Sequence, residues 1–432
     1  MTDDQLLTLV ALAGVVVALI WDRLRPDVVA LAGSAVLLVT GVVLPSEVQG
    51  AFASPALIAL ASLFVIVYAI ELSGVLDWLI NKAITLCQRI GALGLWLTIA
   101  LCGGASAFLN NTPIVVLAAP IIRDTAATLG LDPRRFLMPL SYIAILGGCC
   151  TLIGTSTNLL VADMARIGGQ QAFGLFDITP VGLCVALAGG LYLLVVSPWL
   201  SHGNARNTNF VSSAVASGAD AQVGDSRIFV SKHVLDKRKA AISVTVFIGT
   251  IVTAAIGFAP IAATAFAGAV LLILLRVINA DEAYSGLRPQ ILLLIAGMVV
   301  VGIAMEESGL AKEVTSGLVG VVRPFGPLLA LAVFYGVTLF LTEILSNATV
   351  AVLFAPIAIA LAESLGVSSR PFLVAVMMAA SAAFATPFGY QTNVIVYQLG
   401  GYAYTDFVRV GLPLNIITWM VGLFAISWFF PF

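Results

Sequence analysis

Residues 92–129 read ALGLWLTIALCGGASAFLNNTPIVVLAAPIIRDTAATL, an apolar segment with a polar break at its centre. The break consists of Asn110, Asn111, Thr112 and Pro113. A helix needs about 20 apolar residues to cross roughly 30 Å of hydrocarbon, and this segment is nearly twice that long. It therefore predicts either two membrane crossings or a re-entrant hairpin whose tip is the polar break.

The same pattern returns in the second half of the chain. Residues 327–365 form another long apolar segment, broken at Ser346-Asn347-Ala348. Further matches lie at an offset near 235: Gly154-Thr155-Ser156-Thr157-Asn158 with Gly389-Tyr390-Gln391-Thr392-Asn393, Glu71 and Gly74 with Glu306 and Gly309, and Asp177 and Gly182 with Asp406 and Gly411. Low-complexity apolar sequence would align leucines but not these asparagines. We predict a duplication, with a first membrane repeat at 1–200, a linker at 201–239 and a second repeat at 240–432.

The composition is that of an integral membrane protein. Charged residues make up 10% of the 432 residues, against roughly 25% in an average soluble domain, and hydrophobic residues make up 60%. The first apolar stretch, 6–20, follows Asp3 and Asp4 rather than a basic region, so it predicts a retained span and not a signal peptide. No basic stripe marks a nucleic-acid partner, and membrane lipid is the expected surrounding.

The distribution of basic residues decides between the two topologies, because Lys and Arg gather on the inner side of membranes. If both broken segments are re-entrant hairpins, each repeat has five crossings, and this odd number inverts the second copy. With the N-terminus outside, all but four of the 20 basic residues then lie on the inner side. The exceptions are Arg166, Lys312, Arg323 and Arg370.

The predicted fold is therefore an all-α integral membrane protein. It has two inverted repeats of five transmembrane helices, each with a re-entrant hairpin (92–129 and 327–365) and a broken helix. Mixed stretches at 74–90 and 309–322 are expected to be amphipathic helices at the interface. We expect a multi-pass protein of the cell inner (plasma) membrane, with the linker 201–239 in the cytoplasm.

The four polar breaks are the candidate site. Unpaired backbone groups are tolerated at membrane depth only inside protein or beside water, and matching breaks in two inverted halves indicate the binding site of a transporter. Asn and Thr supply neutral oxygens for a cation and donors for an anion, and Gly154 and Gly389 let the backbone leave the helix. The alternative interpretation is that these amides only hold helices together.

Glu343 is the candidate coupling carboxylate. It lies four residues before Asn347, whereas Ala107 holds the equivalent position before Asn111, so the carboxylate is not part of the repeated pattern. It could assist cation binding, accept a proton or form a structural pair. Both histidines, His202 and His233, lie in the linker, so a histidine proton relay is not expected.

At these motifs the chain resembles the divalent anion/sodium symporters of the ion-transporter superfamily, over nearly its whole length. The stretch 386–393, with Gly400-Gly401-Tyr402 and Asp406, is similar to the bacterial sulfate/dicarboxylate permease branch, here without an inserted regulatory domain. The resemblance implies a homodimer that binds a small anion and uses sodium ions for coupling, with no other cofactor. It also implies roles by position, as follows. The first sodium site comprises Ser106, Asn110, Asn111 and Gly154, and the second Thr342, Asn347 and Gly389. The anion contacts are Asn111, Thr112 and Asn347, with Thr157 and Thr392 as further candidates.

We therefore expect a secondary carrier of sulfate or a dicarboxylate, not an enzyme. The second tip reads Ser-Asn-Ala, and Ala348 lacks a hydroxyl that dicarboxylate carriers use, which favours a smaller oxyanion such as sulfate. A cation/proton antiporter or a metalloid or oxyanion efflux permease of the same superfamily is the alternative. A membrane scaffold or receptor is disfavoured, because it would have no use for the polar breaks.

Overall fold

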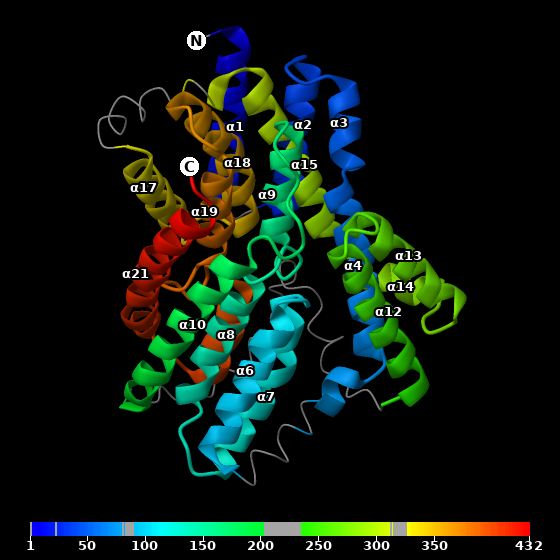
Figure 1. The fold of residues 1–432 in the computed structure, drawn as a ribbon, viewed down its shortest axis with the longest axis vertical. Coiled ribbons are helices and arrows are strands. Elements are labelled where there is room, and N and C mark those ends of the chain that lie inside the picture. The colour runs from blue at the N-terminus through cyan, green and yellow to red at the C-terminus, as the bar shows by residue number, and fades with distance from the viewer. Residues whose placement is uncertain are drawn as a thin grey trace.

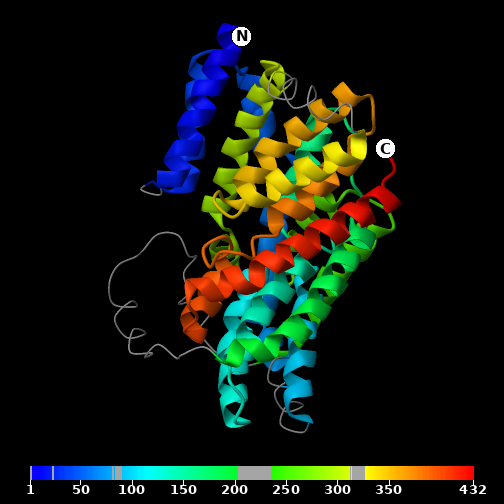
Figure 2. The ribbon, with the colours of Figure 1, turned by 90° about the vertical axis from the view of Figure 1, so that its left-hand side faces the viewer.

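The structure is a computed structural model that describes residues 2–21, 24–79, 82, 90–202, 235–311, 313 and 326–432. All regular secondary structure in these ranges is helical, and Figures 1 and 2 show the helices as one bundle. Within the described residues, six helices are long and apolar enough to cross a membrane: Pro45–Leu72, Thr179–Leu200, Lys237–Ala255, Pro289–Glu307, Asn347–Leu365 and Tyr404–Phe429. These findings confirm the prediction of an all-α, multi-pass membrane protein.

The first half of the described chain is built from helices. They are α1 (Asp3–Trp21), α2 (Pro26–Val39), α3 (Pro45–Phe52), α4 (Pro55–Leu72), α6 (Ala92–Ser106), α7 (Asn111–Thr128), α8 (Arg134–Gly148), α9 (Ser156–Ile167) and α10 (Thr179–Val196), followed by the 3-10 helix η1 (Ser197–His202). Proline begins α2, α3 and α4, where its missing N–H costs nothing because the first N–H groups of a helix have no partner within it.

The second half has the same order of helices. They are α12 (Lys237–Ala255), α13 (Ile261–Leu274), α14 (Ala280–Gly286), α15 (Pro289–Glu307), α17 (Pro327–Leu341), α18 (Asn347–Leu365), α19 (Arg370–Ser381), α20 (Gln391–Gly400) and α21 (Tyr404–Phe429). Helix α12 begins three residues before the predicted start of the second repeat, and the Asp236 carboxylate caps it by accepting hydrogen bonds from the Arg238 and Lys239 N–H groups. The described order agrees with a duplication, whose domain boundaries stay a prediction.

Contacts between the two halves come in corresponding pairs. Helix α2 packs on α15 and α4 on α13, while α7 packs on α20 and α9 on α18. Helices α10 and α21, which hold the same place in the two halves, pack on each other. The halves are therefore interleaved.

Each broken apolar segment forms a pair of packed helices. Helices α6 and α7 join through 107–110, and α17 and α18 through 342–346. Each pair is entered through a glycine with positive φ, Gly91 at 61° and Gly326 at 84°. Figure 1 places α6 and α7 at the lower end of the molecule and α17 and α18 in its upper half. Their re-entrant placement in the membrane stays a prediction.

Close approach of backbones holds the first hairpin to the broken helix behind it. A Cβ on Gly147 of α8 would lie 2.0 Å from the carbonyl oxygen of Gly103 on α6. Small residues at such crossings let membrane helices approach closely. The tip of the hairpin is thereby fixed beside the break in α8–α9.

Three predicted segments fall largely outside the described residues. They are the interfacial stretches at 74–90 and 309–322 and most of the linker at 201–239.

Candidate functional site

The tip of the first hairpin is built around Asn111, which is 1% exposed. The Ser106 hydroxyl donates to Asn111 Oδ1. The Asn110 side chain caps α7 by accepting from the Thr112 N–H at 3.2 Å. Ser106 precedes the tip and Asn110 ends it, and their hydrogen bonds stabilise the turn between α6 and α7.

The break between α8 and α9 packs directly on this tip. The Thr151 hydroxyl donates to the Ala107 carbonyl and accepts from the Gly154 N–H at 3.2 Å. Asn158 Nδ2 donates to the Thr151 carbonyl at 2.9 Å, and Asn158 Oδ1 is buried with no hydrogen bond in the described part of the chain. The polar residues of the break thus order its backbone.

Gly154 lies where backbone oxygens converge. A Cβ at this position would lie 2.5 Å from the Gly148 carbonyl oxygen and 2.8 Å from that of Ala107. A Cβ on Gly148 would in turn lie 2.8 Å from Asn111 Oδ1. Uncharged oxygens from the tip and the break therefore gather around the positions predicted for the first sodium ion. Oxygen ligands of this kind suit a hard cation.

The second tip and break repeat these contacts residue by residue. The Thr342 hydroxyl donates to Asn347 Oδ1 at 2.9 Å, as Ser106 does to Asn111. The Gly389 N–H donates to the Thr386 hydroxyl at 3.0 Å, as Gly154 does to Thr151. Asn393 Nδ2 donates to the Thr386 carbonyl at 3.2 Å, as Asn158 does to that of Thr151.

Glu343 distinguishes the second site from the first. Its carboxylate accepts hydrogen bonds from the Ala385 and Thr386 N–H groups at 2.8 and 3.0 Å, and from the Thr386 hydroxyl at 2.9 Å. Asn415 Nδ2 of α21 donates to it at 2.7 Å. Four donors thus hold the carboxylate against the break and α21. The sequence left open whether Glu343 has a structural partner or a role in coupling, and these contacts give it structural partners.

The first tip also contacts the second break. Asn111 Nδ2 donates to the Tyr390 hydroxyl at 2.8 Å, and the Thr112 hydroxyl donates to Gln391 Oε1 at 3.1 Å. These bonds join residues 279 positions apart in the chain. They bring two of the predicted anion contacts, Asn111 and Thr112, to the break that contains Gly389.

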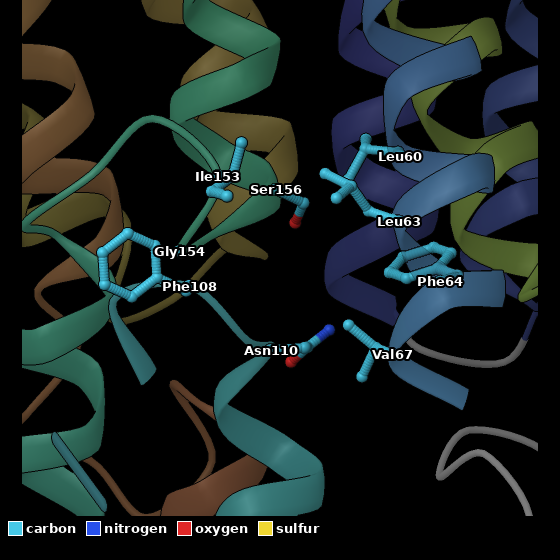
Figure 3. A pocket seen from close by; sticks show the side chains of 9 residues that line it. All are labelled: Leu60, Leu63, Phe64, Val67, Phe108, Asn110, Ile153, Gly154 and Ser156. Atoms are coloured by element: carbon cyan, nitrogen blue, oxygen red, sulfur yellow. The ribbon is translucent and has the colours of Figure 1, made fainter. Parts of the chain in front are cut away.

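A small cavity opens beside the first tip, between α4 and the first break. Its lining residues are Leu60, Leu63, Phe64, Val67, Phe108, Asn110, Ile153, Gly154 and Ser156. Figure 3 shows the Asn110 side chain pointing across the cavity toward Val67 of α4. The polar tip thus borders open space on the side of α4.

The structure groups the predicted site residues into two clusters. Ser106, Asn110, Asn111 and Gly154 lie together with Thr112 at the first tip, and Thr342, Asn347 and Gly389 lie together with Glu343 at the second. It does not bring Thr157 and Thr392 to the tips. Both are buried, Thr157 bonded to the Thr155 hydroxyl at 3.2 Å and Thr392 accepting from Ser141 of α8 at 2.8 Å.

The sequence analysis did not identify Tyr390 and Gln391 as residues of the site. It also did not identify Thr151 and Thr386, whose hydroxyls hydrogen-bond the two breaks to the hairpin tips. The signal for the first two was present: they differ from Thr155 and Ser156, their counterparts in the first repeat. Thr386 and Thr151 also match at the repeat offset. Their roles depend on contacts with the hairpin tips, which spacing alone does not reveal.

These features define a membrane transport protein with two matching polar sites between interleaved halves. A family model described as citrate transporter matches residues 16–369 and 344–431. The chain belongs to this citrate transporter family. The match, with the names of the relatives below, confirms the resemblance to divalent anion/sodium symporters.

The chain is similar to several transporters over most of its length. It is 26% identical to an uncharacterized transporter of Synechocystis sp., covering 96% of both chains, and 24% identical to an uncharacterized transporter of Escherichia coli, covering all of both. Over 106 residues it is 45% identical to a probable sodium/sulfate cotransporter of Chlamydomonas reinhardtii, which is 23% of this chain and 12% of that protein. Since the relatives are named as transporters, the prediction of a permease and not an enzyme is confirmed.

Proposed function

We propose that this protein carries a small divalent anion across the membrane by alternating access, in symport with sodium, and that sulfate is favoured over a dicarboxylate. The observation that carries the proposal is the repeated tip-and-break cluster, in which backbone carbonyl oxygens lie around Gly154, and the Thr386 hydroxyl and the Glu343 carboxylate lie beside Gly389. Two such clusters suit two sodium ions, which would supply positive charge next to a doubly charged substrate.

The proposed sodium sites are those predicted from the sequence. Ser106, Asn110, Asn111 and Gly154 form the first, and Thr342, Asn347 and Gly389 form the second. The first cluster has no acidic residue among these, so the ion would be bound by neutral oxygens. In the second, Glu343 lies 3.2 Å from the Cβ position of Gly389 and adds negative charge.

The proposed anion contacts are the amide and hydroxyl donors at the two tips, Asn111, Thr112 and Asn347. Helices α7 and α18 begin at these tips, so their positive dipole ends face the same region. Ala348 in the second tip offers no hydroxyl, which supports sulfate over a longer dicarboxylate. The Chlamydomonas relative that carries the name sodium/sulfate cotransporter supports the same substrate class. A homodimer is proposed from the family resemblance alone.

Replacing either tip asparagine tests the site. In Asn111→Ala the Ser106 hydroxyl loses its acceptor and the Tyr390 hydroxyl loses the Asn111 donor, and in Asn347→Ala the Thr342 hydroxyl loses one of its two acceptors. We expect sodium-dependent uptake of labelled sulfate into proteoliposomes to fall about 100-fold, the effect of losing roughly 3 kcal/mol of binding. Size-exclusion profiles of the purified variants should match the unaltered protein.

Gly104→Ala is the matched control, because a Cβ there meets no atom within 4 Å and the residue lies on the same hairpin. It should transport at the unaltered rate. Wild-type rates in both asparagine variants would show that the site assignment is wrong.

A further inference from the structure

The two helix breaks agree at three of five positions and differ at the other two. Glycine, threonine and asparagine recur, as Gly154, Thr157 and Asn158 in the first repeat and at 389, 392 and 393 in the second. Between them the first repeat has Thr155 and Ser156, where the second has Tyr390 and Gln391. The positions that order the backbone are shared, and the two adjacent positions differ in size.

The larger pair reaches across to the opposite half. The Tyr390 hydroxyl lies 2.8 Å from Asn111 Nδ2, and Gln391 Oε1 lies 3.1 Å from the Thr112 hydroxyl. Gln391 Oε1 is engaged as an acceptor, so its Nε2 keeps two N–H donors. No hydrogen bond from this Nε2 occurs within the described residues, and the Gln391 side chain is exposed.

The corresponding contact, between the second tip and the first break, has only short side chains at these positions. The second tip carries Ala348 where the first carries Thr112, and the first break carries Ser156 where the second carries Gln391. Within the described part of the chain, no side-chain hydrogen bond joins Asn347 or Ala348 to the first break. The small cavity beside the first tip has Ser156 and Gly154 in its wall and faces α4. The first tip is therefore hydrogen-bonded to two large side chains of the second break, and the described residues show no equivalent bond between the second tip and the first break.

We propose that Tyr390 and Gln391 determine substrate specificity, an inference that rests on the proposed anion transport. Their side chains occupy volume beside Asn111 and Thr112 that a chain of four carbons would need. The free N–H groups of Gln391 donate to an oxygen of the bound anion. Together they select a compact tetrahedral oxyanion and exclude a C4 dicarboxylate.

Exchanging the pair for its counterparts in the first repeat tests the inference. Gln391→Ser and Tyr390→Thr shorten the side chains beside Asn111 and Thr112, and Gln391→Ser also removes the proposed donor. We expect the ratio of labelled sulfate uptake to labelled succinate uptake, measured in the same proteoliposomes, to fall by about tenfold in each variant and further in the double variant, which is the discrimination that pocket size typically supplies. This ratio does not depend on the fraction of protein that folds.

Two further variants separate the contributions. Tyr390→Phe keeps the ring and should keep the ratio, because it removes only the hydroxyl. Tyr404→Thr, at the exposed start of α21, is the control for loss of a tyrosine and should also keep the ratio. If a variant transports neither anion, the same change in preference is expected when sulfate and succinate are compared as stabilisers of the solubilised protein against thermal unfolding.

The outcomes separate this inference from the proposed function. Sulfate uptake by the unaltered protein with an unchanged ratio in Gln391→Ser and Tyr390→Thr would overturn the specificity role alone. Absence of uptake of both anions by the unaltered, folded protein would overturn the proposed function, and the specificity role with it.

Discussion

Glu343 shows how a single residue acquires a role from its surroundings. A carboxylate in a membrane segment is costly unless donors compensate it, and here the Ala385 and Thr386 N–H groups, the Thr386 hydroxyl and the Asn415 amide do so. These four donors leave its oxygens fully used in holding the second break.

Glu343→Gln should therefore weaken the fold around the second break. The glutamine amide turns one donor toward other donors, and at least one backbone N–H loses its acceptor. We expect the stability of the detergent-solubilised protein to fall by about 2 kcal/mol, seen as a lower temperature of unfolding. Glu307→Gln, at the exposed end of α15, is the matched control and should unfold with the unaltered protein. An unfolding temperature unchanged in Glu343→Gln would contradict the structural role.

At the scale of residues, the sequence alone was enough to predict the two tip asparagines but not their contacts. Asn111 and Asn347 could be found because amides are rare in apolar segments and these two recur at the repeat offset. Tyr390 could not be connected to Asn111, because their contact joins residues 279 positions apart and depends on how the halves interleave. The donors around Glu343 were hidden for the same reason, since Asn415 is 72 positions away.

At the scale of helices, ion pairs at equivalent positions join the halves in the described part of the chain. Arg134, at the start of α8, pairs with Asp406 of α21 at 2.6 Å, and Arg370, at the start of α19, pairs with Asp177 before α10 at 2.7 Å. Both arginines and both aspartates are equivalent in the repeat. Each arginine also lies over an aromatic ring, Arg134 over Tyr402 at 5.1 Å and Arg370 over Phe173 at 4.5 Å. The predicted topology places one ion pair at each face of the membrane. The two pairs therefore hold the outer ends of the broken helices α8–α9 and α19–α20.

The two ion pairs should contribute differently to the stability of the protein. The Arg134 and Asp406 side chains are 9% and 17% exposed, against 23% and 39% for Arg370 and Asp177. Arg134→Met leaves a carboxylate that is largely removed from water, so it should destabilise the protein by about 3 kcal/mol. Arg370→Met should cost about 1 kcal/mol, because its partner remains solvated.

Thermal unfolding of the two arginine variants in detergent tests this order. The double variant Arg134→Met/Asp406→Leu should recover part of the loss, because it removes the unpaired charge. Equal unfolding temperatures in the two single variants would contradict the difference in burial.

At the scale of the whole molecule, the all-α membrane fold and the order of its elements could be predicted because both follow from hydropathy and the repeat. Hydropathy could not predict how α2 packs on α15 or α10 on α21, since apolar surfaces in a membrane do not specify their partners. The site depends both on contacts between neighbouring segments and on the packing of the two halves. Each tip and its own break come from neighbouring segments, whereas the link between the first tip and the second break comes from the interleaving.

The central claim is that sodium drives the uptake of a small divalent anion through the two clusters. The most direct measurement is uptake of labelled sulfate and labelled succinate into proteoliposomes, with an inward sodium gradient compared with choline. We expect sodium-dependent accumulation, with sulfate preferred. Equal uptake in sodium and choline, or none of either anion in vesicles that hold folded protein, would contradict the claim and make the antiporter or efflux permease the better account.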